Sequence, residues 1–256
     1  YYYRVAKFFF ETVVLHRSYV IGGNSSGEHF GPSDTEPLSR EAAETCNTYN
    51  MIKLAKYLFK WTKDSKYIDF IERATYNHIL ASQDPHTGCK IYFTSNYPGH
   101  FKVYGTKEDS FWCCTGTGME NPGRYTHHIF FKEDEDFYVN LFMASSFVKE
   151  DEQLKVVLQT DFPISNVVKL VFEEANQLFL NVKIRVPYWL NAPIEVRFKG
   201  QSYEANGQGY LMISDTFHAD DEIEIVLPMG LHEYVSMDDP HKVAFMYGPV
   251  VLAAVL

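Results

Sequence analysis

The change of hydrophobic period near residue 137 constrains the fold of this chain more than any other feature. Before it, apolar side chains recur at helical spacing, and after it they alternate with polar ones as in strands. We predict helices over 3–15, 41–62, 66–82 and 118–130, and strands over 137–143, 154–159, 167–172, 178–185, 194–198, 209–213, 222–227 and 243–252. The chain therefore divides into an α domain, residues 1–136, and a β domain, residues 137–256.

The spacing of the strands is typical of an antiparallel β-sandwich, because turn signals such as Asn206-Gly207 separate short alternating runs. Two segments of the α domain, 22–37 and 84–117, are rich in Gly, Ser and Pro and show no period. Loops of this length without structure of their own are often functional. We therefore expect a functional site in these two loops.

Charge and hydropathy narrow the classes of partner. The net charge is −10 and no long basic run is present, which argues against nucleic acid, because phosphates are neutralised by clustered Lys and Arg. No apolar stretch reaches the roughly 20 residues of a membrane span. The chain opens on Tyr1-Tyr2-Tyr3-Arg4 without an initiator methionine, which indicates a fragment of a longer protein. Its compartment and oligomeric state stay open.

The four cysteines are too few for a disulfide-built scaffold of this length. Cys113 and Cys114 are adjacent, so a bond between them would be strained. They lie in a Gly/Thr loop just before a predicted helix, whose N-terminus favours thiolates. The alternative is a pair of buried thiols acting as small apolar residues. Cys89 has no partner in view and is interpreted as a free thiol.

The segment Glu44-Thr45-Cys46 adds a carboxylate and a third thiol. Three thiolates and one carboxylate make a tetrahedral donor set that suits zinc. Residues two apart on a regular helix point about 200° apart, so both reach one ion only where the backbone is irregular or at a helix end. The alternative interpretation leaves Glu44 in solvent and Cys46 in the core.

Glu28 lies in the glycine-rich loop 21–31, where the backbone can approach a ligand closely. A carboxylic acid beside His29 and Phe30 is suited to general acid catalysis. As a single feature it fits a solvated loop glutamate better.

Four segments together resemble one family: 11–31 (ETVVLHRSYVIGGNSSGEHFG), Glu44-Thr45-Cys46, 111–121 (FWCCTGTGMEN) and 243–253 (VAFMYGPVVLA). They are similar to the bacterial beta-L-arabinofuranosidase families, zinc-dependent glycoside hydrolases with a catalytic α/α barrel followed by β-sandwich domains. The resemblance implies a partial α/α barrel in residues 1–136, without its N-terminal part, and an antiparallel β-sandwich in 137–256. An incomplete barrel is expected to leave an apolar face exposed.

The resemblance also implies roles for named residues. A zinc ion would be held by Glu44, Cys46, Cys113 and Cys114. Cys113 would be the nucleophile of a retaining mechanism, and Glu28 the general acid/base. Tyr92 matches a substrate-contacting tyrosine, and His16 and His29 are candidate sugar contacts by position.

The implied function is a retaining glycoside hydrolase that releases L-arabinofuranose, or a related sugar, from arabinose-containing glycans. The main alternative is a non-catalytic carbohydrate-binding protein with a structural zinc site, because a closed four-ligand set is typical of structural zinc. A third is a lyase or another α/α-barrel enzyme without covalent catalysis. The position of Glu28 relative to the four candidate ligands separates the first two.

Overall fold

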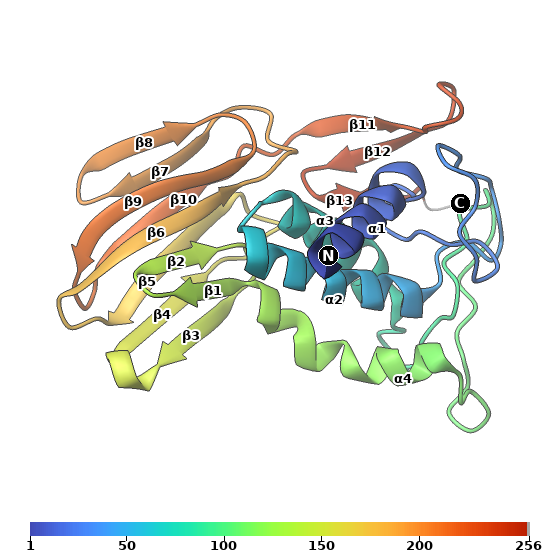
Figure 1. Cartoon of the computed structure of the whole chain (residues 1–256), viewed down its shortest axis with the longest axis horizontal. Helices are drawn as coiled ribbons and strands as arrows, with labels where there is room; N and C mark the ends of the chain where they lie inside the picture. The colour runs from blue at the N-terminus through green and yellow to red at the C-terminus, as the bar shows by residue number, and fades with distance from the viewer. Residues whose placement is uncertain (255–256) are drawn as a thin grey trace. The chain divides into compact units, whose positions relative to one another are not determined.

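Helices occupy the first half of the computed structural model, which describes residues 1–254, and strands occupy most of the second half (Figure 1). The helices are α1 (Tyr2–His16), α2 (Thr45–Thr62), α3 (Lys66–Ala74) and α4 (Cys113–Glu120). A π-helical turn (η1, Thr75–Ile79) and a 3₁₀ turn (η2, Leu80–Ser82) continue α3, and a second 3₁₀ segment (η3, Pro122–His128) follows α4.

Two predicted helix starts were wrong. The helix predicted from residue 118 begins at Cys113, because the backbone leaves the extended conformation directly after Trp112. It ends at Glu120, and Pro122, which lacks an N–H donor, begins the 3₁₀ segment instead. The helix predicted from residue 41 begins at Thr45, because Ala42 and Glu44 form β-bridges with other segments.

The helical core lies between α2 and α3. Apolar side chains at helical spacing are buried there, including Ala55 and Leu58 on α2 and Ile71 on α3. Fully burying a side chain of the size of leucine contributes about 1.5–3 kcal/mol. Helix α1 buries only Phe10 and Val13, and it leaves a run of apolar side chains exposed: Tyr2, Val5, Phe8, Phe9 and Leu15. An exposed apolar face, as expected from the sequence, is therefore present on α1.

Residues 126–230 form a separate compact unit of two sheets. One has the order β1 (Phe130–Glu133), β2 (Asp136–Val139), β6 (Leu178–Val186), β9 (Gly209–Phe217); the other has β3 (Ser145–Lys149), β4 (Leu154–Gln159), β5 (Val167–Glu174), β10 (Glu222–Val226), β7 (Ile194–Phe198), β8 (Gln201–Ala205). Phe217 of the first sheet stacks on Phe172 and Phe198 of the second, with ring centroids 4.3 and 5.1 Å apart. The pairing is antiparallel except between β2 and β6, which run parallel, contrary to the prediction.

The last strands belong with the helices. Strands β11 (Leu231–Val235), β12 (Val243–Tyr247) and β13 (Val250–Val251) form a three-stranded antiparallel sheet in the compact unit of residues 1–125. The side chain of Asn77 donates to the carbonyl of Pro249 at 2.8 Å and accepts from the amide of Val251 at 2.8 Å. The predicted strand at 243–252 is therefore not part of the β unit, and the division at residue 137 is corrected for the C-terminal segment.

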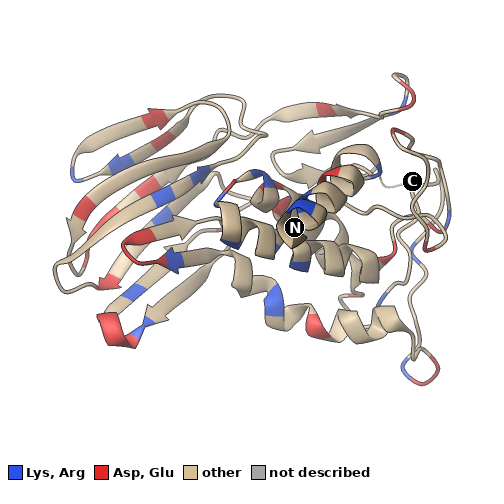
Figure 2. Ribbon diagram, in the orientation of Figure 1, with Lys and Arg blue, Asp and Glu red and all other residues tan. Residues whose placement is uncertain are grey.

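The order of helices followed by largely antiparallel sheets is confirmed, whereas the partial α/α barrel and the β-sandwich stay predictions. On the six-stranded sheet, charges of opposite sign pair across strands, as Lys169–Glu222 (2.8 Å) and Arg197–Glu224 (2.7 Å) do. Exposed pairs of this kind contribute about 0–1 kcal/mol each. Figure 2 shows basic and acidic positions spread over the strands of this unit. Among residues 1–254, no helix has the length and apolarity that crossing a membrane requires.

Candidate metal centre

Four side chains from the N-terminal ends of two helices converge on one point. The ligand atoms of Glu44, Cys46, Cys113 and Cys114 all lie within 4.8 Å of one another. The two sulfurs of Cys113 and Cys114 are 3.9 Å apart, and each is 3.8 Å from Glu44 Oε1. Because the N-terminus of a helix carries a partial positive charge, thiolates and carboxylates are favoured at such positions. The structure brings together all four residues that the sequence predicted as ligands.

The start of α2 explains how Glu44 and Cys46 reach the same point. Glu44 is the N-cap residue and has an extended backbone (φ −63°, ψ 131°), whereas Cys46 lies in the first helical turn. The Glu44 amide donates to Ser25 Oγ at 3.0 Å, and the Thr45 amide donates to the carbonyl of Tyr92 at 3.0 Å. The two side chains are therefore not separated by the 200° of a regular helix.

The glycine pair of loop 22–37 allows this part of the chain to pack closely. Gly22 has φ +84°, which favours glycine, and a Cβ built on it would lie 2.8 Å from Ala74 Cα. A Cβ on Gly23 would lie 2.3 Å from Ala43 Cβ, directly beside Glu44. Gly22 is thus packed against the backbone of Ala74, and Gly23 against the Cβ of Ala43, the residue before the candidate ligand Glu44.

Glu28 lies in a tight two-residue turn. The main chains of Ser26 and His29 exchange two hydrogen bonds, of 2.9 and 3.1 Å, around Gly27 (φ 54°) and Glu28 (φ 66°). Positive φ at both central positions is the mark of a type I′ turn. A non-glycine residue in this region costs on the order of 1 kcal/mol, and such strain is concentrated at functional positions.

Tyr92 links this turn to the cysteine cluster. Its hydroxyl donates to Glu28 Oε1, and Cys113 Sγ lies 3.5 Å from the same hydroxyl oxygen. The carboxylate of Glu28 and the sulfur of Cys113 are thus separated by a single hydroxyl group. Of the three sulfurs in the cluster, that of Cys113 belongs to an exposed residue, whereas Cys46 and Cys114 are buried.

The electrostatics of the cluster favour a bound cation. Burial raises the pKa of Glu44, and the negative charge of Glu28 raises it further. The hydrogen bond between the thiols of Cys46 and Cys114 raises the pKa of Cys46 and lowers that of Cys114. The bond to Glu28, followed by that to Cys113, raises the pKa of Tyr92, which keeps its phenol protonated. Groups that can carry negative charge are thus crowded together, and a metal cation would relieve their repulsion.

The spacing of the donors also fits a tetrahedral ion. With Zn–S of about 2.3 Å and Zn–O of about 2.0–2.2 Å, neighbouring donors of a tetrahedral site lie about 3.5–3.8 Å apart. The three separations among Glu44, Cys113 and Cys114, of 3.8 to 3.9 Å, are close to this range, and all four donor atoms lie within 4.8 Å of one another. The group could therefore hold a metal ion, and its thiol-rich composition suits zinc.

Of the other predicted site residues, one lies at the cluster and the others lie elsewhere. Tyr92 lies at the cluster. His29 takes part in the turn through its main chain, whereas the ring of His16, at the end of α1, bonds Asp34 at 2.7 Å. Cys89 is a free cysteine outside the cluster.

Sequence reasoning missed a cavity of about 280 Å³ beside Tyr92, whose lining includes Arg40, Glu41, Phe93, Phe101 and Trp112. The rings of Tyr92 and Trp112 meet edge to face at 6.0 Å, and Trp112 directly precedes Cys113. The aromatic residues around the cysteine pair were the signal that could have pointed to it.

Comparison with known proteins places both parts of the chain. The solved structures similar to it include a GH127 beta-L-arabinofuranosidase from Geobacillus stearothermophilus T6 (TM-score 0.85, 22% identity, covering 97% of this chain and 42% of that one). A second, a GH127 beta-arabinofuranosidase, has a TM-score of 0.82 at 21% identity and covers 94% and 42%; a third, titled as a glycoside hydrolase, has 0.80 at 19% and covers 94% and 46%.

At these identities the solved structures establish a shared fold, and the chain spans less than half the length of each. No curated protein is detectably similar to it in sequence. Residues 1–127 match the beta-L-arabinofuranosidase GH127 catalytic domain, and residues 136–229 match the GH127 middle domain. The two matches together account for most of the chain, which belongs to the GH127 beta-L-arabinofuranosidase family.

Proposed function

We propose that this chain carries the catalytic centre of a retaining glycoside hydrolase that releases L-arabinofuranose, or a related sugar, from arabinose-containing glycans. The observation that carries the proposal is the hydroxyl of Tyr92, which contacts both the carboxylate of Glu28 and the sulfur of Cys113. The carboxyl group and the exposed thiol lie on either side of one hydroxyl group. A glycosidic bond placed between them can be protonated by the first and attacked by the second.

Cys113 is the nucleophile in this proposal. It is the exposed cysteine of the cluster, so a substrate can reach its sulfur, whereas burial withdraws Cys46 and Cys114. Its place in the first turn of α4 favours a negative charge on that sulfur.

The reaction proceeds in two displacements. In the first, a bond forms between Cys113 Sγ and the anomeric carbon while the bond from that carbon to the leaving oxygen breaks, and Glu28 donates its proton to the oxygen. In the second, Glu28 removes a proton from water, the water oxygen bonds to the anomeric carbon, and the sulfur leaves as a thiolate. Two inversions at one carbon return the original configuration.

Glu44, Cys46, Cys113 and Cys114 would hold zinc. When bound, zinc keeps its sulfur ligands deprotonated at neutral pH and neutralises their charge. Glu44 contributes a carboxylate. Its main chain is held in place by a hydrogen bond to Ser25 and by a β-bridge to Phe93, the residue after Tyr92. Glu44 thus bonds the segment that carries the acid/base, and its carboxylate lies beside the nucleophile Cys113.

The cavity beside Tyr92 supports binding of a sugar. Its aromatic lining offers the flat apolar faces on which sugar rings pack, and Arg40 and Glu41 offer groups that bond hydroxyls. Glu41 also contacts the Glu28 turn, because its carbonyl accepts from the Gly27 amide at 3.0 Å. The cavity therefore borders both the acid/base turn and the residue before the nucleophile.

A non-catalytic carbohydrate-binding protein with a structural zinc site is the second candidate. Its support is the complete set of four donors, since structural zinc usually has four protein ligands and catalytic zinc three. It gives no reason for Glu28 to occupy a strained turn beside an exposed thiol. That feature favours the enzyme.

Trapping the covalent intermediate tests the choice. An arabinofuranoside with an acidic phenol as leaving group is mixed with the Glu28→Gln variant, in which the second displacement is slowed. Intact-mass analysis should show one added pentosyl group, and peptide mapping should place it on Cys113. If the wild type turns the substrate over but the Glu28→Gln variant carries no adduct on any cysteine, the thiolate mechanism is refuted. If the wild type binds the substrate without turnover, the structural site is favoured.

A further inference from the structure

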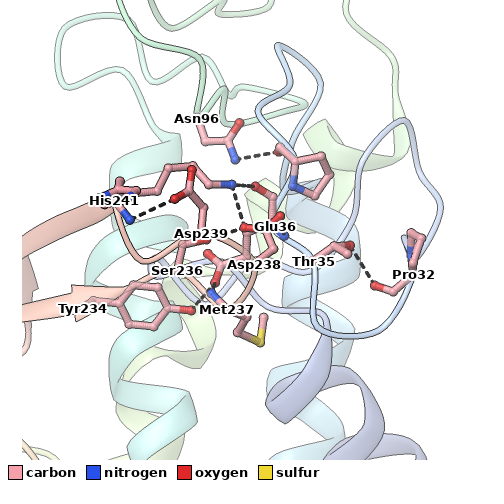
Figure 3. Close-up of polar contacts among 12 residues, drawn as sticks. Pro32, Thr35, Glu36, Asn96, Tyr234, Ser236, Met237, Asp238, Asp239 and His241 are labelled. Atoms are coloured by element: carbon pink, nitrogen blue, oxygen red, sulfur yellow. Dashed lines mark hydrogen bonds and ion pairs between the residues drawn. The ribbon is translucent and has the colours of Figure 1, made fainter.

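A buried carboxylate joins the loop that carries Glu28 to the C-terminal hairpin. Glu36 belongs to the loop between α1 and α2, and only 7% of it is exposed. Its Oε1 accepts from the hydroxyl of Tyr234 at 2.7 Å and from the amide of Met237 at 3.0 Å (Figure 3). Tyr234 lies on β11 and Met237 in the turn between β11 and β12.

The main chain of Glu36 is bonded to the same turn. Its amide donates to Asp238 Oδ2 at 2.9 Å, and its carbonyl accepts from Lys242 Nζ at 3.0 Å. Lys242 Nζ also bonds Asp238 Oδ1 at 2.6 Å, so the two hairpin side chains hold each other in place. We call the set of Glu36, Tyr234, Asp238 and Lys242 the Glu36 clamp.

The clamp has a fixed partner on each side. The C-terminal sheet is attached to the helices through Asn77, which bonds the main chain of Pro249 and Val251. On the other side, Asn96 donates to the carbonyl of Pro37 at 3.1 Å and accepts from the amide of Ser39 at 2.7 Å. Asn96 follows the short segment that carries Tyr92, so the clamp region connects to both partners of the Glu28–Tyr92 bond.

The loop starts from the Glu28 turn and returns to it. After His29 it leaves the turn, passes Glu36, and comes back at Glu41, whose carbonyl accepts from the Gly27 amide, and at Ala42, which forms a β-bridge with Ser26. Fixing Glu36 therefore restricts how far the strained turn can relax. Neither family match, to residues 1–127 or to 136–229, includes the hairpin that does this.

We propose that Glu36 is a positioning residue that, through the β11–β12 hairpin, holds the Glu28 turn where its carboxyl group meets Tyr92 and the leaving oxygen. The inference rests on the proposed role of Glu28 as acid/base. It makes the C-terminal hairpin a working part of the catalytic unit. Misplacing a catalytic group by about 1 Å can lower the rate on the order of 100-fold, which makes such a device measurable.

Leaving-group dependence tests the proposal. In Glu36→Ala, kcat/KM for a disaccharide, whose leaving group needs protonation, should fall about tenfold or more, whereas kcat/KM for an aryl arabinofuranoside with an acidic phenol should change less than about threefold. Glu36→Gln keeps an acceptor for Tyr234 and Met237 and should restore most of the loss. Glu233→Ala removes a carboxylate from the other face of β11 and should behave as wild type.

Amide hydrogen exchange supplies a measurement independent of turnover, and it separates this inference from the proposed function. Exchange of the Ser26 and His29 amides, which close the turn, and of the Gly27 amide, which donates to the carbonyl of Glu41, should be about tenfold faster in Glu36→Ala than in wild type. Equal losses on both substrates, or unchanged exchange, would overturn the positioning role. If Glu36→Ala does not fold, Tyr234→Phe removes one bond of the clamp and should show the same selective loss to a smaller degree.

Discussion

Adding one methyl group at Gly23 should disturb the metal centre without touching any candidate ligand. The Cβ of Gly23→Ala would lie 2.3 Å from Ala43 Cβ and 3.3 Å from His78 Nδ1. Carbon atoms in contact are about 3.5–4.0 Å apart, so Ala43 must move by more than about 1 Å. Ala43 directly precedes Glu44, and the carboxylate of Glu44 would be displaced with it.

The magnitude follows from overpacking, which costs about 1–3 kcal/mol in a well-packed interior. For a unit of about 150 residues, this lowers Tm by about 2–12 °C. Differential scanning calorimetry measures this loss, and elemental analysis after dialysis measures the zinc retained. We expect Gly23→Ala to lose both stability and metal.

Two other glycine-to-alanine substitutions serve as controls for the loss of stability at Gly23. A Cβ at Gly116, inside α4, would meet nothing within 4 Å, so Gly116→Ala should raise stability by about 0.5–1 kcal/mol. A Cβ at Gly118 would meet Cγ of Lys90 at 2.6 Å, so that side chain must shift, whereas at Gly23 the clash is with the short, buried side chain of Ala43. Stability should decrease in the order Gly116→Ala, Gly118→Ala, Gly23→Ala. A Gly23→Ala protein with wild-type Tm and full zinc content would refute the reasoning.

Four further outcomes are expected. Cys113→Ser should abolish turnover of every substrate, whereas Glu28→Gln should retain activity on an aryl substrate with an acidic phenol; steady-state kinetics, with zinc assayed in parallel, distinguishes the two patterns. Chelation should lower Tm and expose the cluster thiols to a thiol reagent, and unchanged thiol reactivity would contradict a metal site there. Burial lowers the pKa of His78 to about 4 from about 6.5, so the unfolded state binds the extra proton between these values. Unfolding free energy should therefore fall by about 3 kcal/mol as pH decreases from 6.5 to 4, and denaturant titration of His78→Gln should lack that slope. Trp112→Ala should raise KM for glycans more than for small aryl substrates, and equal effects would argue against the cavity as a sugar site.

The candidate donors of the metal centre could be named from the sequence because the Cys-Cys pair and the Glu-Thr-Cys segment resemble one family. Their local chemistry by itself suited zinc but left the alternative of buried thiols and a solvated Glu44 open. Helical spacing located α1, α2 and α3, because each buries one stripe of apolar side chains. Alternation located most strands of the β unit for the same reason.

Tertiary structure decided how these pieces combine. The extended backbone of Glu44, which lets it share a site with Cys46, arises from bonds to Ser25 and to the segment around Phe93, far away in sequence. The left-handed conformation of Glu28 depends on a turn that hydropathy does not reveal, because hydropathy reports burial and not φ. Pairing of β2 with β6 in parallel is likewise a choice of neighbour, and strand patterns do not specify neighbours.

The C-terminal hairpin shows the difference most clearly. Alternation predicted one strand over 243–252, in the β domain. The structure instead has β12 and β13 within that range, adds β11, which was not predicted, and groups all three with residues 1–125. Its place beside the helices depends on single polar contacts, such as those of Glu36 with Asp238 and of Asn77 with Val251. Contacts between residues so far apart leave no periodic trace in the sequence, because each needs only one side chain of the right chemistry at a position that the rest of the fold provides.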